Sequence, residues 1–228
     1  MRFIASVVMG MVVCGCSSSA YDAAYTKRLA DYQAAGEFAP LRPEPVALAD
    51  GRLSLRLPAV LANQLDGGEE PKRAKPPFID DFPGFVVAYE GMADAADIRF
   101  PLVLTVGLVP AGERRKEEVA EAILRQVRKD EEFGKAAWQK GREVVDAAGE
   151  ARKWDVLELA GPQPFVAEKA GIMTTSRIGG TTEVWLSADP GQKASVILAF
   201  RVPEEAAGKL PLPALSTLTA RTVRHTEP

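Results

Sequence analysis

Apolar residues at every second position mark the first strand of the folded part of this chain. Between Gly51 and Pro58, leucines at 53, 55 and 57 alternate with polar residues, which indicates a strand with one buried face. Pro58 has no backbone N–H to donate, so the strand ends there. The fold is therefore expected to begin near Val46, shortly before this strand.

Runs of β-branched and aromatic residues predict two hairpins and two further strands. In chain order these are 85–89 with 102–109, then 142–145, 153–159, and 181–188 with 194–202. Residues 66–77, with paired glycines and three prolines, are expected to form an exposed loop before them. An acidic connection over 91–99 joins the first hairpin, Gly161-Pro162 ends the strand at 153–159, and Asp189-Pro190-Gly191-Gln192 is the turn of the last hairpin.

A helical period of 3.6 residues predicts two helices in the same region. The longer one runs from Glu113 to Phe133, with Gly134 in the position of a C-terminal cap and Trp138 packed under its exit. Its core-facing residues are Val119, Ala122, Ile123, Val127 and Phe133. A short closing helix carries Leu212, Leu215 and Leu218, and the residues after 224 are expected to be a loose tail.

Charge and composition suit one packed core and exclude a nucleic-acid footprint. The chain has 28 basic and 31 acidic residues and is 46% hydrophobic. The basic clusters at 72–75 and 114–116 lie beside acids, which is typical of a solvated surface. We expect one α+β domain over residues 46–224, followed by a tail at 225–228.

The first residues resemble a bacterial lipoprotein signal peptide. Arg2, an apolar run from Phe3 to Val13, and the lipobox-like Val13-Cys14-Gly15-Cys16 carry the resemblance. The run has eleven residues, too few to cross a bilayer as a mature helix. The resemblance implies removal of residues 1–15, lipidation of Cys16 by a diacylglyceryl group and an acyl chain such as palmitate, and a membrane anchor in the cell envelope.

Two other interpretations of this segment stay open. Ser18-Ser19-Ala20 is a tolerable cleavage site for an ordinary secreted protein. Cys14 is the weaker lipid acceptor, because Val13 before it is not small. Ser17 in place of an acidic residue resembles the outer-membrane sorting pattern of enterobacteria, a rule that depends on the organism, so the periplasmic face and the cell surface both remain open.

Residues 16–45 are interpreted as a lipidated tether. Tyr21, Tyr25, Leu29 and Tyr32 fall on one stripe of a short helix that Gly36 closes. This stripe lies either on the membrane or a partner, or on the chain's own domain, and we favour the second. Prolines at 40, 43 and 45 then predict a semi-rigid spacer before the domain.

No catalytic constellation is visible, and neither a cofactor nor a metal site is predicted. The single histidine, His225, falls in the expected tail, and the chain lacks a nucleophile elbow, a Ser-x-x-Lys pair, a P-loop and a dinucleotide fingerprint. Clusters of acids occur at Asp80-Asp81, at Asp94 with Asp97, and at residues 130–132. Solvated surface is the favoured interpretation, and a hydrolase or cation site requires the first two clusters to converge in one cleft.

One acidic pair has an unusual setting. Asp80 and Asp81 are surrounded by Phe78, Phe82 and Phe85, which suggests a pocket rim or a partner-facing patch. The same pattern also arises from ordinary core residues at the entrance of a strand, and we prefer that interpretation.

The order of elements is similar to the Mog1/PsbP-like fold, an antiparallel sheet between layers of helices. The strand 51–58, the helix 113–133, the strands around Trp154 and Trp185, and the ending 215–223 carry this resemblance, while Ala59-Val60-Leu61 and the long loop at 66–77 depart from it. It implies a binding or assembly module, because proteins of this fold tend to act as accessory or partner-binding subunits.

The sequence therefore predicts a lipid-anchored envelope protein that binds another envelope protein and does not catalyse a reaction. The alternative is a carrier of a small apolar ligand or lipid in the concave face of the sheet. That alternative requires an apolar pocket of roughly 300 to 1,000 Å³.

Overall fold

A computed structural model describes residues 36–65, 74–95, 98–110, 112–188, 194–208 and 211–225 of the chain. The folded unit begins at Phe38. Cys16, the expected helix before Gly36 and the turn at 189–192 lie outside the described residues. No helix in the described ranges combines the length and the apolar character needed to span a membrane.

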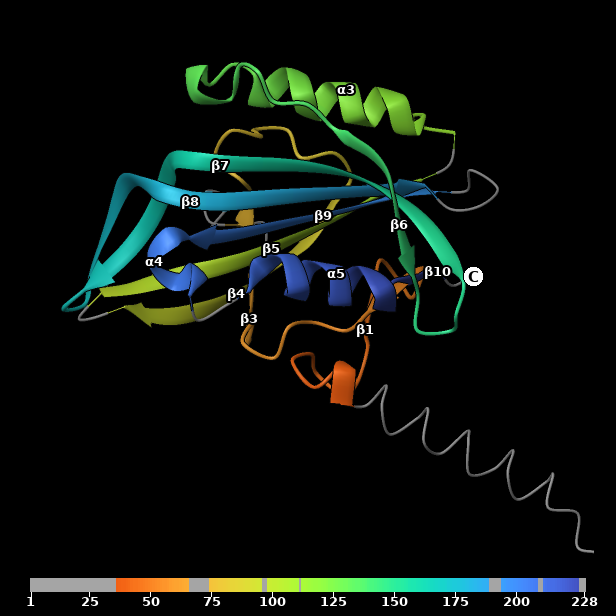
Figure 1. Cartoon of the computed structure of the whole chain (residues 1–228), viewed down its shortest axis with the longest axis horizontal. Coiled ribbons are helices and arrows are strands. Elements are labelled where there is room, and N and C mark those ends of the chain that lie inside the picture. Colours follow the sequence, from red (N-terminus) through yellow and green to blue (C-terminus); the bar gives the residue numbers. More distant parts are fainter. Residues whose placement is uncertain are drawn as a thin grey trace, which may run out of the picture. The chain divides into compact units, whose positions relative to one another are not determined.

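Seven antiparallel strands form the central sheet (Figure 1). In spatial order they are β3 (Asn63–Leu65), β4 (Phe85–Ala95), β5 (Ile98–Pro110), β9 (Ala194–Pro203), β8 (Ile172–Ala188), β7 (Ala151–Lys169) and β6 (Gln139–Val145). Both predicted hairpins are present, as β4–β5 and β8–β9. The α+β architecture, an antiparallel sheet with helices on its faces, is confirmed.

Two of the predicted loop segments are strand. Residues 91–95 and 98–99, expected to belong to an acidic connection, extend the β4–β5 pairing up to the register Ala95 opposite Ile98. Gly161-Pro162 does not end β7 either, because the strand continues to Lys169. Between Val156 and Glu168, which pairs with Arg99 of β5, strand β7 has β8 as its only neighbour. A proline in this stretch can face the unpaired edge of β7, where no backbone N–H is needed for a neighbouring strand.

Paired glycines let the β7–β8 hairpin bend at this point. Gly161 pairs with Gly180, and Gly161 has a φ of 138°, a backbone conformation open to glycine and strained for other residues. Past the bend, the end of β7 returns to the start of β5, where Glu168 pairs with Arg99. The sheet is therefore strongly curved at this end, as Figure 1 shows.

One face of the sheet is covered by the C-terminal helices and a small second sheet. The helices are α4 (Glu204–Ala207) and α5 (Leu212–Thr222), and the small sheet has the order β1 (Val46–Leu48), β2 (Leu53–Leu55), β10 (Arg224–His225). The leucines at 53, 55 and 57 are fully buried here, as their alternation predicts. Trp154 and Trp185 meet edge to face in the same core, with ring centroids 6.0 Å apart.

The opposite face carries α3 (Lys116–Val127), whose buried residues Val119, Ile123 and Val127 match the predicted stripe. The helix is shorter than the predicted 113–133. Asp130 stops it, because its side chain accepts a hydrogen bond from the Glu132 N–H and caps a separate 3-10 helix, η1 (Glu131–Phe133). Gly134 caps η1 and not α3.

Both edges of the folded unit differ from the predicted boundaries. Phe38 and Leu41 are buried, and Leu41 forms a β-bridge with Pro58, so the proline-rich segment packs on the domain rather than serving as a spacer before Val46. At the other end, His225 is paired with Leu53 in β10 and is not part of a loose tail. The sequence pattern missed both because each contact joins segments far apart in the chain.

Candidate functional site: a groove with a buried arginine

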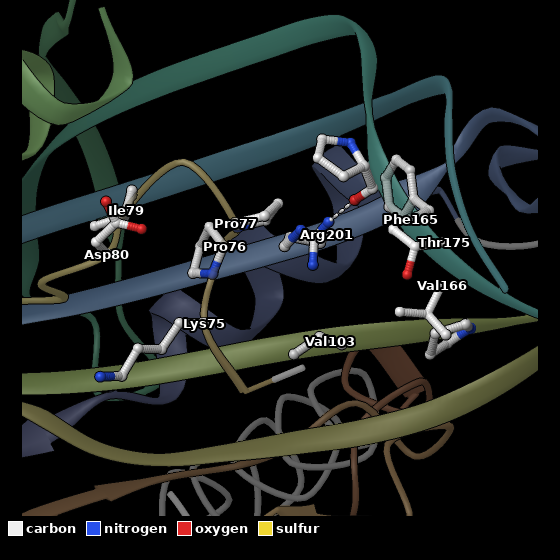
Figure 2. A pocket seen from close by; sticks show the side chains of 12 residues that line it. Lys75, Pro76, Pro77, Ile79, Asp80, Val103, Phe165, Val166, Thr175 and Arg201 are labelled. Atoms are coloured by element: carbon white, nitrogen blue, oxygen red, sulfur yellow. Dashed lines mark hydrogen bonds between the residues drawn. The ribbon is translucent and has the colours of Figure 1, made fainter. Parts of the chain in front are cut away.

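A groove of about 450 Å³ opens at the curved end of the sheet, on the face that carries α3 (Figure 2). One wall is the segment 75–80, the other is the bent β7–β8 hairpin, and the ends of β5 and β9 lie between them. Its volume lies within the range of roughly 300 to 1,000 Å³ that is usual for small-molecule sites. Eight of the twelve lining residues are apolar: Pro76, Pro77, Ile79, Pro101, Val103, Pro164, Phe165 and Val166.

The groove exists because two strands separate at this end. Strand β9 pairs with β5 only from Val103 onwards, and β7 lacks a second neighbour over most of its outer half. Each of these open edges carries a proline, Pro101 on β5 and Pro164 on β7, which has no N–H to offer to another strand. The open edges therefore stay unpaired and leave space between them.

Arg201 lies in the middle of this lining, as Figure 2 shows. It belongs to β9, in a run of buried residues, and is only 6% exposed. Its Nη2 donates a 2.5 Å hydrogen bond to the carbonyl oxygen of Pro164. Its buried Nε has no hydrogen-bond partner within the described part of the chain. A strongly polar group is thus held in an apolar setting with part of its hydrogen-bonding capacity unused.

No carboxylate in the described part of the chain forms an ion pair with Arg201. In its own row of the sheet, Glu90 lies two strands away with Val103 between them. Burial lowers the pKa of the Arg201 guanidinium to about 10, so the side chain is still a cation at neutral pH. The groove therefore contains a desolvated positive charge that no carboxylate of the described residues neutralises by an ion pair.

The ring of Phe165 packs against the guanidinium. The Cζ atom of Arg201 is 4.9 Å from the centroid of the Phe165 ring, a cation–π contact. The bend beneath the ring is held by Gln163, whose Nε2 donates to the carbonyl oxygens of Leu159 and Gly180 and whose Oε1 accepts from Thr182. These buried hydrogen bonds keep the wall of the groove in one conformation.

Three further polar side chains line the groove: Lys75, Asp80 and Thr175. The Nζ atom of Lys75 lies 5.2 Å from the centroid of the Phe85 ring. Asp80 and Thr175 are exposed. The lining thus contains two cations and one carboxylate.

The residues predicted from the sequence to form a pocket rim or partner-facing patch lie partly in this groove and partly in the core. Asp80 lines the groove, whereas Asp81 is tied to α3 through two 2.9 Å backbone hydrogen bonds with the Gln126 amide. Phe82 is buried in the core under α3, and Phe78 meets Phe133 edge to face at 5.4 Å. Phe85 packs against the same core from β4.

The acidic clusters do not converge. Asp80 and Asp81 lie just before β4, whereas Asp94 is near the other end of that strand and pairs with Arg99 at 3.4 Å. Asp97 lies outside the described residues. Asp130 forms a two-pronged ion pair with Arg177, at 3.0 and 3.1 Å, that closes η1 onto the hairpin. In the described ranges, no three acids, histidines or cysteines are grouped as a metal site requires.

Sequence reasoning missed Arg201 and Phe165. Arg201 is the one charged residue within the apolar strand run Val196–Val202, and a charge in a predicted buried strand was a signal that could have singled it out. Phe165 has no such signal in the sequence, because it follows a glycine-proline pair, which predicts the end of a strand.

No protein-family model and no curated protein matches the chain. Among solved structures, a Bacteroides thetaiotaomicron crystal structure aligns at 12% identity and a TM-score of 0.38, over 81% of this chain but only 48% of its own. The Ran-binding protein Mog1p of Saccharomyces cerevisiae aligns at 14% identity and 0.40, over 81% of this chain and 96% of its own. Cyanobacterial PsbP (CyanoP) from Synechocystis aligns at 9% sequence identity and a TM-score of 0.39. The alignment covers 80% of this chain and 92% of CyanoP. At TM-scores this low, the architecture rests on the elements of this chain alone.

Proposed function

We propose that this chain is a lipid-anchored, non-catalytic binding protein of the cell envelope, whose folded unit holds a small molecule in the groove around Arg201. The observation that supports the proposal is the groove of about 450 Å³ with a mostly apolar lining and one buried cation that forms no ion pair with the described residues. This volume suits a carrier of a small apolar ligand or lipid.

The polar groups of the lining support binding as the proposed role of the groove. Thr175 is the only hydroxyl of the described lining and Asp80 its only carboxylate. In the described part of the chain, Thr175 and Asp80 are not hydrogen-bonded to each other. Nucleophilic catalysis needs a nucleophile and a base within hydrogen-bond reach. Arg201 stays protonated at neutral pH and therefore does not act as a base.

A blocking variant tests the groove. The wild-type chain is purified from envelope membranes, extracted with organic solvent and searched for a stoichiometric small molecule by mass spectrometry. Thr175→Trp places a large ring in the groove from an exposed position, so the small molecule is lost. Thr174→Trp is the matched control, because its side chain points to the other side of the same strand. Equal recovery from both variants, or none from wild type, contradicts the proposal.

The anchor is tested separately, because its support is the lipobox resemblance alone. Cys16→Ala is expected to leave the membrane fraction and to lose the mass of the lipid from its N-terminus. Cys14→Ala is the matched control and stays membrane-bound. A chain that begins at Tyr21 without lipid would show an ordinary secreted protein instead.

A protein partner, the first expectation from sequence, is the second candidate function. Ile172 and Met173 at the tip of the β7–β8 hairpin are 65% and 44% exposed, which is unusual for large apolar side chains next to each other. Replacing both with serine is expected to abolish crosslinking of one specific envelope protein to this tip. If the crosslinked proteins are the same for wild type and the double variant, the hairpin tip is not the partner site.

A further inference from the structure

We infer that the groove binds an anionic amphiphile, a molecule with a carboxylate or phosphate headgroup on a hydrocarbon chain, and that the headgroup pairs with Arg201. This inference rests on the proposed function, since it names the class of ligand for the same groove. Two independent observations carry it, the state of the arginine and the composition of the lining.

The burial and charge of Arg201 favour an anionic ligand. A cation that is 6% exposed and has no carboxylate partner among the described residues has lost its hydration without an ion pair to offset the loss. An anionic ligand supplies the missing partner. The Nε–H has no acceptor among the described residues, so the hydrogen-bonding capacity of the guanidinium is not used up within the described part of the fold.

The guanidinium suits an oxyanion in particular. Its planar donors match the oxygens of a carboxylate or phosphate, and a two-pronged pair of this kind is stronger than a hydrogen bond between neutral groups. The contact with Phe165 and the hydrogen bond to Pro164 restrict the guanidinium before a ligand binds, which reduces the conformational entropy lost on binding.

The apolar lining of the groove indicates that the ligand also has an apolar part. A simple inorganic anion leaves the apolar surface of Pro77, Pro164 and Val166, which are not buried, in contact with water, whereas a hydrocarbon chain removes that surface from water. Pro76, Pro77 and Val166 lie on the two walls between which such a chain fits (Figure 2). Lys75 and Asp80 belong to the same lining, and together with Arg201 they leave one net positive charge for a headgroup.

The test uses the full-length lipidated chain in nanodiscs and isothermal titration calorimetry, with empty nanodiscs as the reference. The probes are octyl phosphate, octanoate, inorganic phosphate and octyl glucoside, each below its micelle concentration. We expect both octyl anions to bind, and inorganic phosphate and octyl glucoside to bind at least about tenfold more weakly. Arg201→Met is expected to weaken octyl phosphate by about tenfold or more, and Arg201→Lys, which keeps the charge but not the planar donors, by less.

The outcomes separate this inference from the proposed function. If octyl glucoside binds as tightly as octyl phosphate and Thr175→Trp blocks both, the groove is an apolar site and the anionic ligand class is wrong. Inorganic phosphate that binds as tightly as octyl phosphate also overturns the amphiphile. If no probe binds and no small molecule copurifies, the proposed function fails as well. Should Arg201→Met not fold, the comparison of probes on wild type still decides.

Discussion

The guanidinium of Arg201 lies over the ring of Phe165, with its Cζ atom 4.9 Å from the ring centroid. The two residues come from β9 and from the bent end of β7, strands that are not neighbours in the sheet. Their contact spans the groove lining and orients the one buried cation there. The bend of the β7–β8 hairpin and the charge of Arg201 are therefore parts of one site.

Arg201→Met is expected to leave the free energy of unfolding within about 1 kcal/mol of wild type, or to raise it. The variant loses one hydrogen bond and the cation–π contact, but no longer buries a charge that lacks an ion pair among the described residues. Denaturant unfolding measures the difference. A loss of about 3 kcal/mol or more, the cost of removing one member of a buried ion pair, would show that Arg201 has a structural role instead.

Gly180→Ala is expected to destabilise the fold by about 1–3 kcal/mol and to weaken ligand binding. A Cβ atom at this position falls 2.5 Å from Cζ of Phe165 and 2.9 Å from the Val202 carbonyl oxygen, so the ring must move. Thermal unfolding and the octyl phosphate titration measure the two effects. Gly208→Ala is the control, because a Cβ atom there meets nothing within 4 Å. Equal behaviour of the two variants contradicts the account.

Tyr89→Phe is expected to raise the free energy of unfolding by about 1 kcal/mol. The Tyr89 hydroxyl is buried without a hydrogen-bond partner among the described residues, and burial raises its pKa. Removing the oxygen keeps the ring in the core and takes away a polar group that has lost its water. A decrease in stability would mean that the hydroxyl has a partner in solution.

Asp130→Asn is expected to lower the melting temperature at neutral pH. Hydrogen bonds from Arg177, with a further one from the Glu132 N–H, hold the pKa of the Asp130 carboxyl below its usual value of 3.8. Because the folded-state pKa is the lower one, this stabilisation is complete above 3.8 and disappears as the pH falls from there through the folded-state value. The difference in melting temperature between variant and wild type should therefore narrow in acid.

The control for this pH dependence is Glu121→Gln, which removes the exposed ion pair between Glu121 and Arg125 on α3. Exposed pairs of this kind contribute little, so its melting temperature should differ little from wild type at any pH. If the difference in melting temperature between Asp130→Asn and wild type is independent of pH, the ion pair with Arg177 is excluded as the cause of that difference.

Much of the fold could be predicted because its signals are local. Alternation gave the buried leucines of the first strand, and helical spacing gave the face of α3 that carries Val119, Ile123 and Val127. The end of α3 could not be placed, because residues 113–133 continue an acceptable pattern while Asp130 caps a new turn.

The groove could not be predicted for a different reason. Gly161-Pro162 normally ends a strand, yet here β7 continues as an edge on which a proline is tolerated. Only the three-dimensional register brings Pro164 and Phe165 to Arg201. Arg201 is visible in the sequence as a charged residue inside a buried strand. That it forms no ion pair with the described residues depends on the three-dimensional fold.

The most direct test of the central claim is negative-ion mass spectrometry of the small molecules that copurify with the wild-type chain and with Arg201→Met from envelope membranes. We expect an anionic amphiphile in stoichiometric amount with wild type and its loss from the variant, which should fold as well as wild type. Equal amounts of the same molecule in both samples, or no small molecule with wild type, would contradict the assignment of Arg201 as the counter-ion of a bound ligand.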